Sequence, residues 1–117
     1  MPPASVKPPI TMAQLKAIDV RVGTIHALRD IAGADRLVAM RVGFGDHERT
    51  IVAGLKTERA DPAEIVGRQA LFVVNLPPRR MKGVVSEGML FDIGYADGII
   101  PVLAVPERVV PDGSRVG

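Results

Sequence analysis

The side chains best suited to chemistry in this sequence are six polar or charged residues that interrupt an apolar stretch. They are Asn75, Arg79, Arg80, Lys82, Ser86 and Glu87. Arg79, Arg80 and Lys82 place three cations within four residues, the densest basic group of the chain. Clustered cations repel one another, and the nearby prolines and glycines weaken regular strands, so packing alone does not explain this composition. The stretch is therefore predicted to be a binding site, and its cations favour an anionic partner.

Each of these side chains also has a structural alternative. Asn75 could satisfy backbone groups where a strand ends before Pro77. Ser86 and Glu87 could hold the loop in place through local hydrogen bonds. The three cations could form a solvated face. The residues alone leave both interpretations open.

The composition is that of one globular domain with a modest core. The chain has 117 residues, of which 47% are apolar and 24% charged, and its net charge is +2. No apolar run has the length of a membrane span, so no membrane insertion is expected. Prolines in residues 1–10 break the apolar core that a signal peptide needs, so this segment is predicted to be a flexible N-terminal lead-in to a cytoplasmic protein. One domain is expected over residues 11–117.

The sequence does not favour an enzyme. It has no cysteine, which excludes disulfides, thiolate metal sites and a cysteine nucleophile. None of its serines lies in a nucleophile-elbow context, and its two histidines, His26 and His47, are predicted on a strand and in a hairpin turn. Asp46-His47-Glu48 are adjacent residues in that turn, and adjacent residues rarely converge on one metal ion. We therefore expect no catalytic residue, no metal site and no cofactor.

The elements that position the basic group are mostly strands. Five are predicted, at about 18–27, 36–44, 48–53, 70–76 and 89–93, followed by an extended segment at 99–105. Apolar and polar residues alternate in the first two, whereas 70–76 is apolar on both faces except for Asn75. Short helices are predicted at 11–16, with a capping box of Thr11 and Gln14, and at 61–67. In the first strand the alternation slips, and Gly23 is the expected place of a β-bulge. This order favours an all-β, five-stranded Greek-key barrel of the oligonucleotide/oligosaccharide-binding (OB) type, with flanking N- and C-terminal segments.

Three blocks of the sequence resemble the tRNA-binding domain family. The blocks are residues 19–25, 51–55 and 74–90, in the expected order, and the resemblance covers about 15–93. The family includes the C-terminal domain of methionyl-tRNA synthetases, the endothelial monocyte-activating polypeptide domain and free-standing bacterial proteins. The resemblance implies the same OB-fold barrel that the strand pattern predicts.

Within the family the sequence is similar to the free-standing CsaA type, which is described as a protein-export chaperone. The similarity lies in the short length, in residues 75–80 and in the end at 111–116. It implies a homodimer formed through the segments that flank the barrel. The candidate interface residues are Met12, Leu15, Val102, Leu103, Val105 and Val109. Their structural alternative is to cap the barrel's own core.

The resemblance also implies that the domain binds tRNA or another structured RNA through a basic groove, without catalysis. Arg79, Arg80 and Lys82 are the first candidates for phosphate contacts. The second candidates are Arg21, Arg41, Arg49 and Lys56. Asn75 and Ser86 suit a base edge or a ribose hydroxyl, and Glu87 could accept a hydrogen bond from a base or hold an arginine. With only Phe44, Phe72, Phe91 and Tyr95 as aromatic residues, recognition is expected to rest on charge and shape rather than on stacking.

Two other functions stay open at this point. The CsaA resemblance implies that the protein could act mainly as a chaperone for unfolded or pre-secretory polypeptides, with little RNA binding. It could also serve as a dimerising or tRNA-delivering subunit of a separate enzyme.

Overall fold

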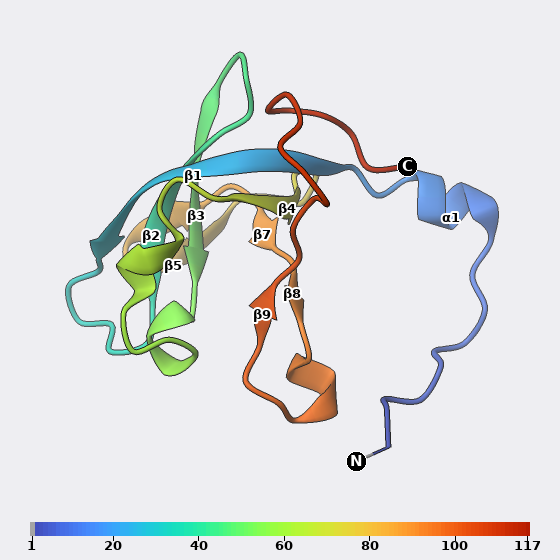
Figure 1. Ribbon diagram of the computed structural model, residues 1–117, viewed down its shortest axis with the longest axis horizontal. Helices are drawn as coiled ribbons and strands as arrows, with labels where there is room; N and C mark the ends of the chain where they lie inside the picture. Colours follow the sequence, from blue (N-terminus) through green and yellow to red (C-terminus); the bar gives the residue numbers. More distant parts are fainter. Residues whose placement is uncertain (1) are drawn as a thin grey trace.

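The structure, a computed structural model that describes residues 2–117, is built mainly from antiparallel strands. Its elements are α1 (Met12–Lys16), β1 (Val20–Asp30), β2 (Val38–Gly43), β3 (Glu48–Ala53), η1 (Leu55–Thr57), η2 (Pro62–Ile65), β4 (Gln69–Val73), β5 (Arg79–Met81), β6 (Val84–Ser86), β7 (Met89–Leu90), β8 (Asp92–Ile93), η3 (Tyr95–Asp97) and β9 (Val102–Leu103). Five strands form one sheet in the order β3-β2-β1-β4-β7. This sheet is strongly curled (Figure 1), as the predicted all-β OB-type barrel requires.

The barrel is closed between β3 and the residues at the end of β6. The backbone N–H of Val52 donates to Ser86 Oγ (3.0 Å), and the N–H of Thr50 donates to Glu87 Oε1 (3.0 Å). The N–H of Glu87 in turn donates to the carbonyl oxygen of Thr50 (2.8 Å). Two side chains therefore supply acceptors along this seam that a continuous strand would supply from its backbone.

The long strand β1 changes partner along its length and holds the barrel together. Its first half pairs with β4 from Val20 to Thr24, and its second half pairs with β2 from Thr24 to Asp30. The β-bulge lies between Ile25 and Ala27, so the prediction of a bulge at Gly23 is wrong. Gly23 is needed for close packing instead, because a Cβ there would lie 2.6 Å from Val42 Cγ1.

The apolar residues form two clusters on opposite faces of β2. The main core fills the barrel and includes Met40, Val42, Phe44 and Phe72. The second cluster consists of Ile31, Ala34, Ala39 and Val52, with Leu37, Met81 and Val84 packed against it. The alternation predicted for 36–44 is confirmed, since even-numbered residues enter the core and Leu37 and Ala39 enter the second cluster. The second cluster fixes the β5–β6 hairpin on the outside of the barrel.

The short helices and the later strands differ in part from the prediction. The capping box of α1 is confirmed, with Gln14 N donating to Thr11 Oγ1 (3.1 Å) and Thr11 N donating to Gln14 Oε1 (2.8 Å). The helix predicted at 61–67 is only the 3-10 turn η2, although Asp61 does cap it. The strand predicted at 89–93 is divided, because β7 pairs with β4 whereas β8 pairs with β9.

The C-terminal segment adds a short ladder to β1. Val22 N donates to the Ser114 carbonyl, Gly113 N donates to the Val22 carbonyl, and Val116 N donates to the Val20 carbonyl, at 2.7 to 2.9 Å. These bonds pair the backbone N–H and C=O groups along the part of β1 that β2 does not reach (Figure 1). The tail is thus part of the sheet.

The N-terminal segment lies apart from the barrel. Of the predicted lead-in, residue 1 lies outside the described residues, while residues 2–10 are exposed and contain no helix or strand. Ala4 N donates to Asp97 Oδ1 (2.7 Å), which links the lead-in to η3. No helix among residues 2–117 has the length and apolar character needed to cross a membrane.

Candidate nucleic-acid interface

The basic group lies on the β5–β6 hairpin, which projects from the barrel. Arg79, Arg80 and Met81 pair with Ser86, Val85 and Val84. The turn between the strands has two residues, Lys82 and Gly83, both with positive φ (51° and 81°), as in a type I′ hairpin. Lys82 is the only non-glycine residue with positive φ among residues 2–117. A lysine is disfavoured in this conformation, so its presence at the turn points to a role other than turn formation.

The hairpin is anchored through apolar side chains and leaves its cations exposed. Met81 and Val84 pack on the second cluster, whereas Arg79, Arg80 and Lys82 are exposed. Within residues 2–117 none of these three cations forms an ion pair. Unpaired cations on a fixed scaffold are available to phosphates at low cost in ordering.

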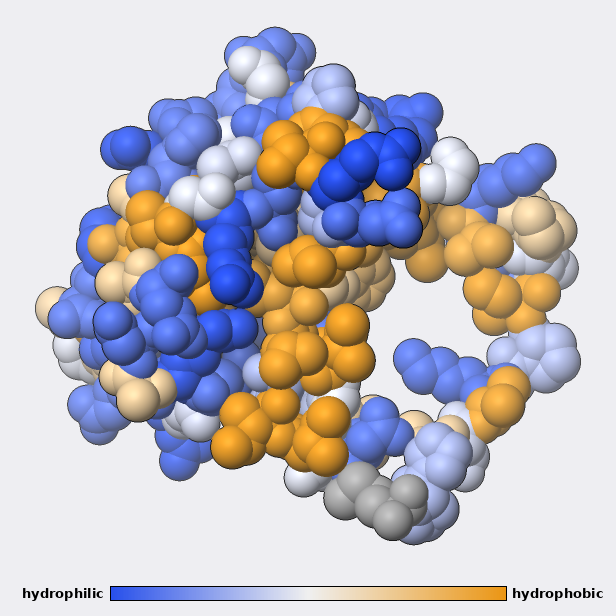
Figure 2. All heavy atoms as spheres, in the orientation of Figure 1, coloured by the Kyte–Doolittle hydropathy of each residue, from blue (hydrophilic) through white to orange (hydrophobic). Residues whose placement is uncertain are grey.

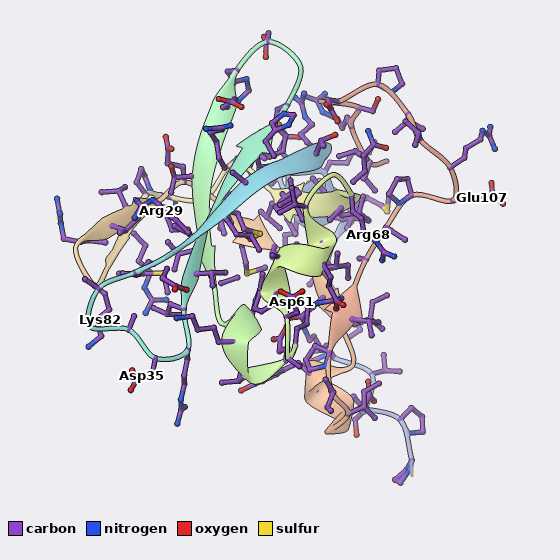
Figure 3. The ribbon with its side chains drawn as sticks, turned by 60° about the vertical axis from the view of Figure 1, so that its left-hand side comes forward. Arg29, Asp35, Asp61, Arg68, Lys82 and Glu107 are labelled. Carbon is purple, nitrogen blue, oxygen red and sulfur yellow. The ribbon has the colours of Figure 1, made fainter. Side chains whose placement is uncertain are left out.

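The connection between β1 and β2 faces the tip of the hairpin. The two border an open cleft of about 370 Å³. Its lining residues are Gly33, Ala34, Asp35, Arg36, Leu37 and Lys82. Figure 3 shows Asp35 and Lys82, together with Arg29, on the same side of the molecule. Arg36 was not expected as a site residue, and only its place beside the connection that follows the first strand could have indicated it.

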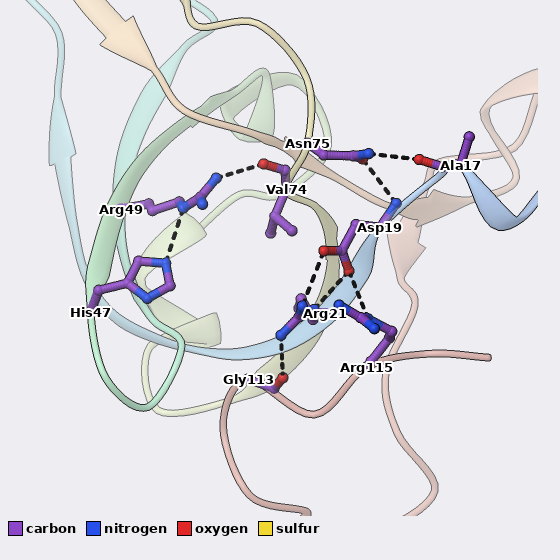
Figure 4. A network of polar contacts seen from close by, with 9 residues as sticks. All are labelled: Ala17, Asp19, Arg21, His47, Arg49, Val74, Asn75, Gly113 and Arg115. Carbon is purple, nitrogen blue, oxygen red and sulfur yellow. Dashed lines mark hydrogen bonds and ion pairs between the residues drawn. The ribbon is translucent and has the colours of Figure 1, made fainter.

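Two arginines of the second group, Arg21 and Arg49, are held at one end of the barrel (Figure 4). Arg21 pairs with Asp19 (2.7 Å) and donates to the Gly113 carbonyl (3.2 Å). Arg49 donates to the Val74 carbonyl (2.6 Å), to the Glu87 carbonyl (3.1 Å) and to His47 Nε2 (3.1 Å). These bonds link β1 to the tail and β3 to the segments that flank the hairpin. Contact of Arg21 and Arg49 with RNA stays a prediction.

The other two members of that group are paired with acids elsewhere. Arg41 lies 3.3 Å from Glu48 and Lys56 lies 2.9 Å from Asp30. Contact of Arg41 and Lys56 with RNA also stays a prediction. Within the described part of the chain, Arg79, Arg80 and Lys82 lie unpaired on the hairpin. Arg49 lies at the base of the hairpin, where it donates to the Glu87 carbonyl, and Arg21 is paired with Asp19.

Asn75, Ser86 and Glu87 all have hydrogen-bond partners within the fold. Asn75 accepts from Asp19 N (2.9 Å) and donates to the Ala17 carbonyl (2.7 Å), which ties the end of β4 to the residues after α1 (Figure 4). Ser86 is buried, and it also donates to the Gly88 carbonyl (3.1 Å). These bonds agree with the structural alternatives, and an RNA contact by the three side chains stays a prediction.

The turn at Asp46-His47-Glu48 is held by side-chain contacts. His47 Nε2 accepts from Arg49, so the Nδ1–H of the neutral ring donates to Asp46 Oδ1 (2.6 Å). This hydrogen bond holds the pKa of the Asp46 carboxyl below its usual value. Glu48 instead faces Arg41. Among residues 2–117 no three histidine or acidic side chains converge as metal ligands.

Asp19 is the centre of a charged network between β1 and the tail. Arg21 donates two hydrogen bonds to it, and Arg115 lies 3.4 Å away. The hydrogen bond from Arg21, and then the charges of Arg21 and Arg115, lower the pKa of the Asp19 carboxyl despite an opposing effect of burial. Asp19 is thus ionised over the whole neutral range and holds Arg115 on the sheet.

The apolar candidates for an interface are exposed, with one exception. Met12, Leu15, Val102, Val105 and Val109 are each more than half exposed, whereas Leu103 is 7% exposed and packs in the barrel core. Further exposed apolar side chains are Ile93, Tyr95, Ile99 and Ile100. Figure 2 shows apolar surface over α1 and over the region of β8, η3 and β9, on either side of the opening between the barrel and the N-terminal segment. We call this surface the apolar face.

A curled antiparallel sheet that carries a basic hairpin defines a small OB-type binding domain. Residues 20–115 match the family model described as "Putative tRNA binding domain". The chain belongs to the tRNA-binding domain family.

Relatives of known sequence or structure agree with this assignment. Methionine–tRNA ligase from Porphyromonas gingivalis is 39% identical over 113 residues, which are 97% of this chain and 16% of the ligase. A MetRS-related protein from Pyrococcus horikoshii has a crystal structure with a TM-score of 0.85 and 32% identity, and the match covers 95% of this chain and 100% of that one. The CsaA chaperone protein from Picrophilus torridus matches with a TM-score of 0.78, 26% identity and coverage of 92% and 99%. The chain thus spans about a sixth of the length of the ligases it matches.

Proposed function

We propose that this protein binds tRNA without catalysing a reaction, and that the β5–β6 hairpin and the facing β1–β2 connection form the binding surface. The observation that carries the proposal is the hairpin itself, with three exposed, unpaired cations on a scaffold fixed by Met81 and Val84. Each phosphate that such cations neutralise releases counterions, which gives affinity without reading sequence. The family match to a tRNA-binding domain supports tRNA as the ligand.

The aromatic residues favour a folded RNA over a single strand. Phe44 and Phe72 are buried and pack edge to face with ring centroids 5.6 Å apart. Phe91 is half-buried, and the exposed Tyr95 belongs to η3 on the apolar face. Because the hairpin cleft has no aromatic lining, stacking of successive bases on such rings does not contribute there. Charge and shape then dominate, which suits the fixed phosphate positions of a folded tRNA.

Alanine substitution of the hairpin cations tests this proposal. A variant with Arg79, Arg80 and Lys82 all replaced by alanine should bind bulk tRNA at least tenfold more weakly than the wild type. Its slope of log affinity against log salt should also be smaller by about 2 to 3, at roughly 0.7 to 0.9 per phosphate contact. The matched control replaces Lys7, Lys16 and Arg68, which are also exposed, and removes the same charge. Equal losses in both variants would show that only net charge matters and would overturn the site.

A second candidate function is the binding of unfolded polypeptides on the apolar face. The exposed side chains of Ile93, Tyr95, Ile100 and Val102 support it, because contiguous apolar surface marks interaction sites. The similar Picrophilus torridus protein is named as a chaperone, which also supports it. The test measures how well the protein suppresses the aggregation of a denatured protein. The Ile100→Ser variant should suppress aggregation less than the wild type. The control variant Val6→Ser, on the N-terminal segment, should suppress it equally well.

We also propose that the protein is a cytoplasmic homodimer, with the apolar face as the interface. Burying Met12, Leu15, Val105 and Val109 against a second copy would remove apolar surface from water. Light scattering coupled to size exclusion would show twice the mass of one chain. A dimer that blocks the apolar face would make polypeptide binding depend on dissociation, so the two proposals are separable by their dependence on protein concentration.

A further inference from the structure

A cavity of about 510 Å³ lies between the end of β1 and the turns η1 and η2, apart from the hairpin cleft. Its apolar wall includes Leu28, Val38, Pro62 and Ala63. The chain passes from β3 to β4 through two short 3-10 turns, so this end of the barrel is capped without a longer helix and the space beside β1 stays open. Pockets that bind small molecules or single nucleotides have volumes in this range.

Three cations border the cavity, and two of them have free hydrogen-bonding capacity. Arg29 is exposed and forms no ion pair within residues 2–117. The side chain of Arg59 is 15% exposed, and its bond to Glu64 Oε1 (2.5 Å) uses one of five guanidinium N–H groups. In the described part of the chain no buried side-chain nitrogen lacks a partner, so the remaining N–H groups of Arg59 are accessible to solvent.

The two acids at the cavity are already engaged. Asp30 pairs with Lys56 (2.9 Å), and Asp61 Oδ1 accepts the N–H of Ala63 as the cap of η2 (3.2 Å). Their charges are therefore partly balanced, whereas Arg29 has no acid partner. The cavity thus offers an unpaired cation at its mouth, a half-free guanidinium and an apolar wall.

The cavity adjoins the hairpin cleft through the backbone. Lys56, which lines the cavity, donates its backbone N–H to the carbonyl oxygen of Arg36 (3.3 Å), and Arg36 lines the cleft with Lys82. An RNA backbone that contacts the hairpin could therefore continue past Arg36, beside the acid Asp35, to Lys56 and the cavity.

We propose that this cavity holds one unstacked nucleotide of the bound RNA, with its phosphate on Arg29 and its base against the Arg59 guanidinium and the apolar wall. Arginine planes serve as stacking surfaces for bases where aromatic rings are lacking, as they are at the hairpin. The inference rests on the proposed RNA binding and adds to it a second contact that favours tRNAs with an extruded base. A free nucleotide carries the same phosphate and base as a nucleotide within an RNA chain, so the test must distinguish bound RNA from a free nucleotide.

The test combines a steric block with a charge deletion. Ala63→Trp fills the cavity without a change in charge, and its control is Ala4→Trp on the exposed N-terminal segment. Arg29→Ala removes the unpaired cation, and its control is Arg68→Ala. Arg29 and Arg68 are both exposed and form no ion pair among residues 2–117, so both charge variants should fold.

Loss of the nucleotide contact should weaken binding of bulk tRNA by about 5- to 150-fold in Ala63→Trp, the range found for one stacked base. Arg29→Ala should also reduce the salt slope by about 0.7 to 0.9, and both controls should remain within twofold of the wild type. In ¹⁵N-labelled protein, adenosine monophosphate should shift the amide signals of Asp30, Lys56 and Ala63, whereas inorganic phosphate should shift only signals near Arg29.

The possible results distinguish a failure of the cavity inference from a failure of the proposed tRNA binding. If the wild type does not bind tRNA, the proposed function fails and the cavity has no RNA to hold. If the wild type binds tRNA and Ala63→Trp and Arg29→Ala bind as tightly as their controls, the cavity inference alone is overturned. If adenosine monophosphate shifts the cavity signals while the tRNA affinity of both variants is unchanged, the cavity takes free nucleotides and its assignment to RNA is wrong.

Discussion

Ser86 Oγ accepts the backbone N–H of Val52 at 3.0 Å, and this bond lies on the seam that closes the barrel. Ser86 is the one polar or charged residue among the buried residues of the described chain. It also fixes the base of the hairpin, because Ser86 is the last residue of β6 and pairs with Arg79. The barrel seam and the candidate RNA-binding surface therefore share one hydroxyl group.

Replacing Ser86 with alanine should destabilise the protein by about 1 to 3 kcal/mol, because it leaves the buried Val52 N–H without an acceptor. Urea denaturation measures this loss as a lower midpoint at unchanged slope. The control is Ser114→Ala, which removes an exposed bond to the Pro111 carbonyl and should cost less than about 0.5 kcal/mol. Equal effects of the two substitutions would show that Ser86 does not hold the seam.

Asp19 should make the stability of the protein depend on acid pH. Its folded-state pKa lies below the ordinary value of 3.8, because Arg21 and Arg115 favour the ionised form. A depressed pKa contributes stability that is complete above the ordinary value and is lost as the pH falls through the folded-state value. Asp19→Asn should therefore lower the urea midpoint at pH 6 and flatten its fall below pH 4 relative to the wild type. Parallel curves for the two proteins would contradict this role.

Lys82 should affect stability and RNA affinity in opposite directions. Its φ of 51° is unfavourable for lysine and tolerated by asparagine, so Lys82→Asn should stabilise the hairpin by up to about 1 kcal/mol. The same change removes a phosphate contact and should reduce the salt slope of tRNA binding by about 0.7 to 0.9. Lys82→Gln is the matched control, since it removes the charge and keeps the strain. A stabilised Lys82→Asn protein with wild-type affinity would show that Lys82 does not touch RNA.

Gly113 should be essential for the pairing of the C-terminal segment with β1. This residue has a φ of +87°, and a Cβ there would overlap the carbonyl oxygen of Phe44. Gly113→Ala should destabilise the protein by more than about 2 kcal/mol, through backbone strain and loss of the ladder to Val22. Gly33→Ala, where φ is also positive but nothing lies within 4 Å, should cost about 1 kcal/mol. Thermal unfolding of the two variants compares them directly.

The barrel could be predicted because apolar and polar residues alternate along its strands, and this alternation indicates which face of each strand packs inward. Val38, Met40 and Val42 show this in β2. The bulge was predicted at the wrong residue because a glycine can serve two purposes. Gly23 is small so that Val42 can approach, while the register shifts three residues later without a glycine.

The site could be predicted only where charge density marks it. Arg79, Arg80 and Lys82 cluster in the sequence and lie together on the hairpin. Arg36, on the β1–β2 connection, lines the cleft with Lys82, and Arg29, near the end of β1, borders the neighbouring cavity. Neither residue stands in a stretch of marked composition. For Asn75 and Glu87 the sequence left a ligand contact and a structural hydrogen bond equally open. Their partners Ala17 and Thr50 are 58 and 37 residues away and become evident only in the structure.

The most direct measurement is the affinity of the wild-type protein for bulk tRNA across a series of salt concentrations, repeated with a denatured polypeptide as competitor. RNA binding through the hairpin predicts sub-micromolar affinity at low salt, with a log–log slope of about −2 to −4, which the polypeptide does not reduce. Affinity that is too weak to measure near physiological salt, with the polypeptide held more tightly, would contradict the account and make polypeptide binding the main function.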